Sequence, residues 1–224
     1  EPVHGSRWID GHWRTMLTDI HLALPAPPGV PSHCVKGSYD YWHYMLQDTD
    51  DRGWGCGYRS LQMSFSWAAK RKAECSLHAV PVPTLKEIQE CLVKLEDKPP
   101  SFVGSKEWIG SFETMLILDH FLSAQSKLLH LAPYQERDAY TAELIAHFDK
   151  GGGPVMVGGS VGGAMTLLGV QGDNAKDTKY LVLDPHYCGD DVLRDVIGES
   201  WLSWRAPKDV FRGEKSWYNM CLPL

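Results

Sequence analysis

Apolar residues at helical spacing dominate the first half of the chain. Within residues 57–72 no proline interrupts the pattern, and Tyr58, Leu61, Phe65 and Ala68 recur at the spacing of one helix face. A basic stretch at 70–72 suits the solvated end of such a helix, where positive charge complements the helix dipole. The pattern therefore predicts a helix that begins directly after Cys56.

Two more helices are predicted before residue 123. Thr84 and Glu87 have the spacing of a capping box, which marks the start of a helix that must end before Pro99 and Pro100. Residues 109–122 repeat apolar side chains at helical spacing and predict a third helix.

The second half of the chain changes to short apolar runs. These runs predict strands at residues 126–131, 155–157, 164–170, 179–183 and 217–222, with a helix over 140–150 that stops at Gly151. Residues 1–38 contain a proline-rich stretch and predict a loosely structured segment. Helices followed by strands indicate an α+β fold in a single domain over 1–224, with the first helix packed on a mostly antiparallel sheet.

Composition narrows the class of protein. The 224 residues carry a formal net charge of −6, and the only basic cluster is the one at 70–72, so a nucleic-acid partner is not expected. No apolar run reaches the ~20 residues of a membrane span, and the first residues lack the pattern of a signal peptide. The six cysteines are irregularly spaced without a Cys-x-x-Cys pair, which favours a reduced cytoplasmic protein. Nothing in the sequence demands more than a monomer or any cofactor.

Cys56 is the first candidate for chemistry. It lies between Gly55 and Gly57, which leave space around the thiol for an approaching backbone, and it directly precedes the predicted helix. The unpaired amides and the positive dipole end of a helix stabilise a thiolate, which is the nucleophilic form of cysteine. We therefore expect Cys56 to be a nucleophile.

Asp184 and His186 are the second candidate. They follow the strand predicted over 179–183 and are two residues apart, so on an extended strand both side chains point to the same face. Asp184 can then orient the imidazole and stabilise its charged form, which makes His186 the general base. Pro185 between them removes a backbone donor and predicts a strand end or a sheet edge.

A cysteine hydrolase also needs a donor for the developing oxyanion. Papain-like enzymes place a glutamine six residues before the nucleophile, but here that position is Asp50, which accepts hydrogen bonds when ionised. Tyr44 is our preferred donor, with Gln47 as its rival, and the Cys56 backbone amide is a further candidate.

Two other interpretations of these residues are open. Cys56, Asp184, His186 and Cys188 together offer the ligand types of a zinc site, although paired ligand spacings are missing. The same triad also suits a thiol transferase or amidase, and a groove without turnover suits a binding module. For Cys34, Cys75, Cys91 and Cys221 we expect buried, unreactive thiols.

Together these motifs resemble the ubiquitin-fold modifier-specific proteases. The resemblance rests on a Tyr-x-x-Tyr pair at 41–44 and on five runs, namely Gly-Trp-Gly-Cys-Gly-Tyr-Arg-Ser-Leu-Gln at 53–62, Phe-Val-Gly-Ser-Lys-Glu-Trp-Ile-Gly-Ser at 102–111, Pro-Val-Met-Val-Gly-Gly at 154–159, Leu-Asp-Pro-His-Tyr at 183–187 and Tyr-Asn-Met-Cys-Leu-Pro at 218–223. The related autophagin proteases share Gly-Trp-Gly-Cys and Asp-Pro-His but follow the nucleophile with Met-Leu-Arg, and they are the alternative.

The resemblance implies a papain-like fold and a protease that matures the modifier precursor after its C-terminal glycine and releases the modifier from lysines. It implies Cys56 as nucleophile, His186 as base, Asp184 as its orienting partner and Tyr44 as oxyanion donor. The length resembles the compact member of the family, which has no N-terminal extension domain. For a tail ending in glycine we expect a narrow groove walled by Trp54, Gly158 and Gly159.

Overall fold

The computed structural model describes residues 6–9, 12–75, 79–172 and 177–224. Helices dominate up to residue 122 and strands follow, as predicted. The elements in chain order are β1 (Ser6–Ile9), β2 (His12–Thr15), η1 (Ile20–Ala23), β3 (Ser32–Cys34), α1 (Cys56–Cys75), α2 (Leu85–Lys94), η2 (Pro100–Phe102), α3 (Ser111–Leu122), β4 (Ser126–Leu131), α4 (Thr141–Asp149), β5 (Val155–Gly159), β6 (Met165–Gln171), β7 (Lys179–Leu183), α5 (Leu193–Gly198), β8 (Leu202–Arg205), α6 (Pro207–Val210) and β9 (Tyr218–Pro223).

One antiparallel sheet forms the centre of the described fold. Its strands follow the order β4-β9-β5-β6-β7-β8, and β3 pairs with the part of β6 that β5 does not cover. Every residue of β6 is buried, as expected for a strand with neighbours on both edges. Cys34 of β3 lies against Gly169, where a Cβ would come within 2.9 Å of the His33 carbonyl, so glycine is required for this close pairing.

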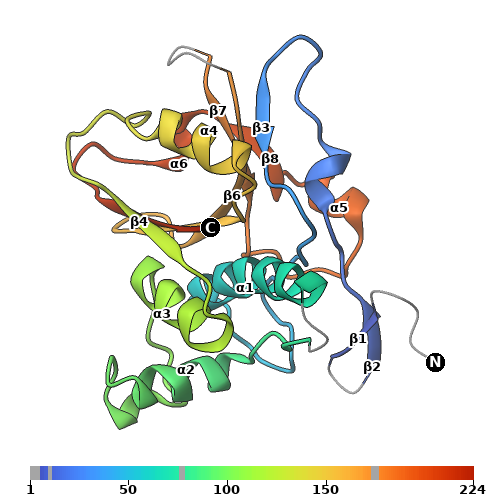
Figure 1. Cartoon of the computed structure of the whole chain (residues 1–224), viewed down its shortest axis with the longest axis vertical. Helices are drawn as coiled ribbons and strands as arrows, with labels where there is room; N and C mark the ends of the chain where they lie inside the picture. Colours follow the sequence, from blue (N-terminus) through green and yellow to red (C-terminus); the bar gives the residue numbers. More distant parts are fainter. Residues whose placement is uncertain (1–5, 10–11, 76–78, 173–176) are drawn as a thin grey trace.

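Helix α1 packs against the sheet and carries the first part of the core. It contacts β5, β6 and α3, while α3 also contacts β4 and β9, and α2 packs on α3 (Figure 1). Two of its buried hydroxyls are paired with backbone groups outside the helix, since Ser64 Oγ donates to the Pro154 carbonyl and Ser66 Oγ accepts from the Asp40 amide. These bonds fix the helix relative to β5 and to the segment that precedes it.

Most predicted helix ends agree with the structure. Thr84 caps α2 through the predicted box, because its Oγ1 accepts from the Glu87 amide and Glu87 accepts from the Thr84 amide. The third helix begins at Ser111 rather than at 109, because the Glu113 carboxylate accepts a bond from the Gly110 amide and sets the first turn there.

Two regions contain more structure than the sequence predicted. Residues 1–38, expected to be loosely structured, include the β1–β2 hairpin, η1 and β3 among their described residues. The elements α5, β8 and α6 were not predicted at all. In the described part of the chain no helix is both long and apolar enough to cross a bilayer.

Candidate active site

Cys56 is the first residue of α1, as the sequence predicted. The preceding turn is closed by bonds from the Trp54 and Gly55 amides to the Asp51 carbonyl, and α1 continues with the Arg59 amide bonded to the Gly55 carbonyl. The thiol is therefore held at the positive end of a helix dipole, with only 7% of the residue exposed.

Asp184 and His186 meet through a turn rather than along a strand. Strand β7 ends at Leu183, and the chain turns so that the Asp184 Oδ1 accepts both from the His186 amide (3.1 Å) and from its ring Nδ1 (2.6 Å). Our explanation by alternating strand positions was therefore wrong, although the predicted contact between the two side chains is present. Arg205 Nη1 lies 3.5 Å from the other Asp184 oxygen.

Cys56, His186 and Asp184 shift one another's pKa values. Burial alone would raise the pKa of the Cys56 thiol, but hydrogen bonds with His186 and with the Ala164 amide outweigh it and hold the pKa below its ordinary value. Burial alone would lower the pKa of His186, but bonds with Asp184 and Cys56 raise it to about 10. Relative to isolated side chains, both shifts favour a thiolate beside an imidazolium.

Tyr44 reaches this pair from the loop before α1. Its amide donates to the Pro185 carbonyl (3.0 Å), and its ring meets the His186 ring edge to face at 5.1 Å between centroids. Burial, followed by the nearby Cys56 sulfur, raises the Tyr44 pKa above its ordinary value, so the phenol keeps its proton. Its buried hydroxyl makes no hydrogen bond of ordinary geometry with the described residues, but it is near enough to the Cys56 sulfur for a looser contact to lower the pKa of the thiol.

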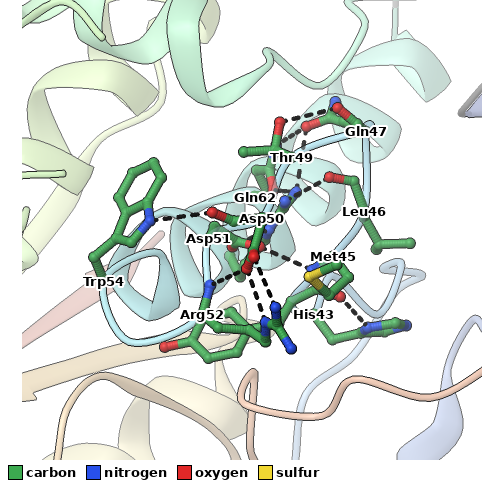
Figure 2. Close-up of polar contacts among 12 residues, drawn as sticks. His43, Met45, Leu46, Gln47, Thr49, Asp50, Asp51, Arg52, Trp54 and Gln62 are labelled. Atoms are coloured by element: carbon green, nitrogen blue, oxygen red, sulfur yellow. Dashed lines mark hydrogen bonds and ion pairs between the residues drawn. The ribbon is translucent and has the colours of Figure 1, made fainter. Parts of the chain in front are cut away.

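The rival donor Gln47 is engaged elsewhere. Its Oε1 accepts from Arg59 Nη1 (3.3 Å) and from Gln62 Nε2 (2.9 Å), both on α1 (Figure 2). This side chain is part of a buried network and not of the group around the thiol.

That network centres on an ion pair between Asp51 and Arg59, whose side chains are both 0% exposed. Asp51 accepts from Arg59 Nε (2.8 Å) and from the Met45 amide (2.8 Å), while Arg59 also donates to the Leu46 carbonyl (2.6 Å). The segment 45–51, which directly follows Tyr44, is thereby tied to α1, and Figure 2 shows its bond between Gln47 and Gln62.

The β5–β6 turn supplies a contact that sequence reasoning missed. The Ala164 amide donates to the Cys56 Sγ at 3.3 Å, and Gly163 before it has a φ of +72°. A Cβ at Gly163 would come within 3.0 Å of His186 Nε2 and 3.5 Å of Cys56 Sγ. The sequence signalled only the glycine pair 162–163, which we expected to be loop glycines or to leave a channel.

A groove of about 290 Å³ begins at Cys56 and is mostly apolar. The three residues predicted to wall it, Trp54, Gly158 and Gly159, all line it. Trp108, 66% exposed, and Trp217, 42% exposed, also line it, and the sequence did not single out Trp217. An extended chain with small side chains fits such a shape better than a bulky one.

Close packing explains the two glycines that flank Cys56. A Cβ at Gly57 would lie 2.5 Å from the Ile109 carbonyl oxygen, and one at Gly55 would lie 2.5 Å from the Asp51 Cβ. Packing alone therefore requires glycine at both positions, and Gly57 also lines the groove beside Cys56.

The zinc interpretation receives no geometric support from the described residues. Among them no group of three or more histidine, cysteine or acidic side chains is placed to hold a metal ion. Cys188 is exposed, and its sulfur donates to the His186 carbonyl at 3.4 Å.

Comparison with known proteins points in one direction. Residues 31–221 match the family described as Peptidase family C78. Ufm1-specific protease 2 of Gallus gallus is 42% identical over 205 residues, which cover 91% of this chain and 43% of the relative. Probable Ufm1-specific protease 2 of Drosophila melanogaster is 42% identical over 96% of this chain and 34% of the relative.

A solved structure, the crystal structure of UfSP from C. elegans, is also similar. It has a TM-score of 0.77 and 34% identity, over 93% of this chain and 37% of that chain. This match confirms the papain-like α+β fold expected from the sequence. The chain spans less than half the length of each of these three relatives.

Proposed function

The chain belongs to peptidase family C78, and from that premise we propose that it is a thiol protease for the ubiquitin-fold modifier Ufm1. It would mature the Ufm1 precursor after its C-terminal glycine and cleave Ufm1 from conjugated lysines. The substrate follows from the names of the relatives, which are Ufm1-specific proteases. The alternative of an autophagin-like protease is not favoured by these matches.

The observation that carries the proposal is the convergence of His186 and Tyr44 on Cys56, which itself lines the apolar groove. The modifier tail would lie between Trp54 and the Gly158–Gly159 wall, with its terminal carbonyl against the thiolate. Trp108 and Trp217 would flank the tail farther from the bond that is cut.

In the first half of the reaction the Cys56 thiolate attacks the carbonyl carbon of the terminal glycine. The Tyr44 hydroxyl and the Cys56 amide donate to the oxyanion that forms. His186, protonated on both ring nitrogens, gives its Nε2 proton to the departing amine as the carbon–nitrogen bond breaks, while Asp184 holds Nδ1.

In the second half, neutral His186 accepts a proton from water, which attacks the thioester. The attack of water on the thioester forms a tetrahedral intermediate. When its carbon–sulfur bond breaks, the modifier carboxylate is released and the thiolate–imidazolium pair is regenerated. The four side chains supply the nucleophile, the acid–base group, its orienting partner and the oxyanion donor, so the proposed reaction uses no cofactor.

The proposal includes location and assembly. The five described cysteines with placed side chains, Cys34, Cys56, Cys91, Cys188 and Cys221, are free thiols, which supports a reducing cytoplasmic setting. The groove and the groups around Cys56 all come from one chain, which supports action as a monomer.

The test is cleavage of two substrates, the Ufm1 precursor and Ufm1 joined to a lysine through an isopeptide bond. We expect both to be cut, Cys56→Ser to abolish cutting, and that variant still to bind Ufm1, because the groove is unchanged. Cleavage by Cys56→Ser above the spontaneous rate would contradict the role of Cys56. Cleavage of small amides as fast as of Ufm1 substrates would favour a general amidase, and binding without cleavage would favour a binding module.

A further inference from the structure

The turn between β5 and β6 contacts the reacting atoms through its backbone alone. We propose that the Ala164 backbone N–H is a catalytic donor that holds the Cys56 sulfur as a thiolate before substrate arrives. This inference rests on the proposed role of Cys56 as nucleophile and adds a group to the site that no side chain reveals.

The geometry of the contact is specific. The Ala164 nitrogen lies 3.3 Å from Cys56 Sγ, Cys56 is 7% exposed and Ala164 is 5% exposed. Since Ala164 directly precedes Met165, whose pairing with Val157 begins the β5–β6 ladder, the amide is anchored to the sheet.

The preceding glycines make this approach possible. Gly162 and Gly163 have φ values of +90° and +72°, a region that side chains disfavour. At Gly162 a Cβ would meet nothing within 4 Å, but at Gly163 it would meet His186 Nε2 at 3.0 Å. Two observations therefore favour glycine at position 163. Its φ is positive, and a side chain there would come close to His186 and Cys56.

A buried thiolate needs more than one partner. Taking a charge out of water is costly unless hydrogen bonds replace the lost solvation. His186 supplies one bond, from the nitrogen opposite the one that Asp184 holds, and the Ala164 amide supplies another. When the thiol proton moves from Sγ to His186 Nε2, the amide remains as a fixed donor that cannot lose its proton.

The amide acts on the resting enzyme more than on later states. As the thiolate forms a bond to the substrate carbon, its charge passes to the carbonyl oxygen and the N–H···S bond weakens. The donor therefore raises the fraction of enzyme that is ready to attack at neutral pH, and its loss is visible in the titration of the thiol rather than only in turnover.

The direct test replaces the Ala164 amide by an ester, with lactic acid in place of alanine in the full chain. We measure the rate of Cys56 alkylation by iodoacetamide against pH. A hydrogen bond to a charged group is stronger than one between neutral groups. We therefore expect the midpoint of the alkylation profile to rise by about one pH unit, which lowers the thiolate fraction roughly tenfold at pH values below the midpoint. An ester at Val161, an exposed residue of the same turn, is the control and should leave the midpoint unchanged. An unchanged midpoint in the folded Ala164 ester would overturn the proposal.

A matched pair of substitutions tests the same contact through the turn. Gly162→Ala and Gly163→Ala both place a side chain at positive φ, but only the second meets His186 and Cys56. We expect the alkylation midpoint to rise for Gly163→Ala and to stay within about 0.2 unit for Gly162→Ala, where backbone strain acts alone. Equal shifts in the two variants would assign the effect to strain and contradict the contact.

A measurement on the unmodified enzyme covers the case in which the ester variant fails to fold. The Ala164 amide proton resonance should shift with pH at the same midpoint as Cys56 alkylation, and the shift should vanish in Cys56→Ala. A resonance that does not follow the thiol would overturn the proposal. If Cys56 titrates as expected but no Ufm1 substrate is cut, the proposed function fails while this inference stands.

Discussion

At the level of single residues, His186 interacts with both Asp184 and Cys56, and these two contacts set its protonation state. Asp184 contacts its Nδ1 at 2.6 Å and the Cys56 thiol takes the other side, so the pKa of the imidazole rises to about 10 although burial opposes the rise. Burial likewise opposes the lowered pKa of Asp184, which His186 and Arg205 outweigh. All three shifts therefore favour the charged forms, namely the Asp184 carboxylate, the His186 imidazolium and the Cys56 thiolate.

The first prediction is the pH dependence of kcat/KM for a Ufm1 substrate. Because the pKa of His186 is raised to about 10, the imidazolium and its stabilising contacts are fully present below its ordinary value near 6.5 and are lost as the pH rises through about 10. We expect activity to persist into the alkaline range and to fall near pH 10. A fall centred near pH 7 would show that His186 is not held in its charged form.

Tyr44→Phe separates a catalytic phenol from a structural one. If the hydroxyl donates to the oxyanion, kcat should fall by about 10²–10³-fold. Since the buried hydroxyl lacks an ordinary hydrogen bond among the described residues, removing it should not lower the free energy of unfolding. Turnover within a few-fold of the wild type, measured together with urea unfolding, would leave the backbone amide as the main donor.

At the scale of elements, one buried ion pair joins the Tyr44 loop to α1. The pair Asp51–Arg59 is 0% exposed at both ends, whereas Asp50–Arg52 on the same loop is mostly exposed. Both pairs join an aspartate to an arginine over a short stretch of chain, so they differ mainly in burial.

This difference gives a matched stability prediction. Asp51→Asn leaves a buried guanidinium without its counter-charge and should lower the free energy of unfolding by about 3–5 kcal/mol. Asp50→Asn should cost less than about 1 kcal/mol, because its partner stays in water. Urea unfolding of both variants tests this, and equal losses would mean that the buried pair does not hold the loop.

The groove wall on β5 offers a second pair. A Cβ at Gly158 would meet only Met156 Cε at 3.9 Å, so Gly158→Ala should fold normally but raise KM for a glycine-ended tail by narrowing the groove. A Cβ at Gly159 would lie 2.5 Å from the Trp217 carbonyl, so Gly159→Ala should lower the melting temperature. Unchanged KM for Gly158→Ala would remove this strand from the proposed binding surface.

The sequence predicted those helices and strands that have a strong local pattern of capping or apolar residues. Helix α2 was found from its Thr84 cap, and α1 from a long apolar face that directly follows Cys56. The six-residue α5 and the edge strand β8 were missed, because most of their residues are only partly buried and show no apolar period. Tertiary packing, rather than local pattern, determines such elements.

The candidate site was predictable only where side chains carry it. Asp184 and His186 are neighbours in sequence, so their contact was expected, though a turn produces it. The Ala164 donor belongs to the backbone and leaves no residue signature. The sequence already favoured Tyr44 over Gln47, and the structure adds a physical argument for that preference, because Gln47 is bonded to Arg59 and Gln62 in a buried network.

At the scale of the whole molecule, the sheet brings together segments far apart in the chain. Strand β6 lies between β5 and β7, so the β5–β6 turn and the residues after β7 reach the start of α1 from the same sheet (Figure 1). The groove is lined by Cys56, by Gly158 and Gly159 on β5, and by Trp217 just before β9. The proposed nucleophile and the proposed binding surface are thus parts of one arrangement.

The measurement that tests this account most directly is labelling by two electrophilic probes, one built on Ufm1 and one on an autophagy-type modifier. We expect only the Ufm1 probe to form an adduct, located on Cys56 by mass spectrometry, lost in Cys56→Ser and kept in Cys188→Ser, which removes an exposed thiol. Labelling by the autophagy-type probe alone, or no labelling of folded protein by either probe, would contradict the proposed substrate and nucleophile.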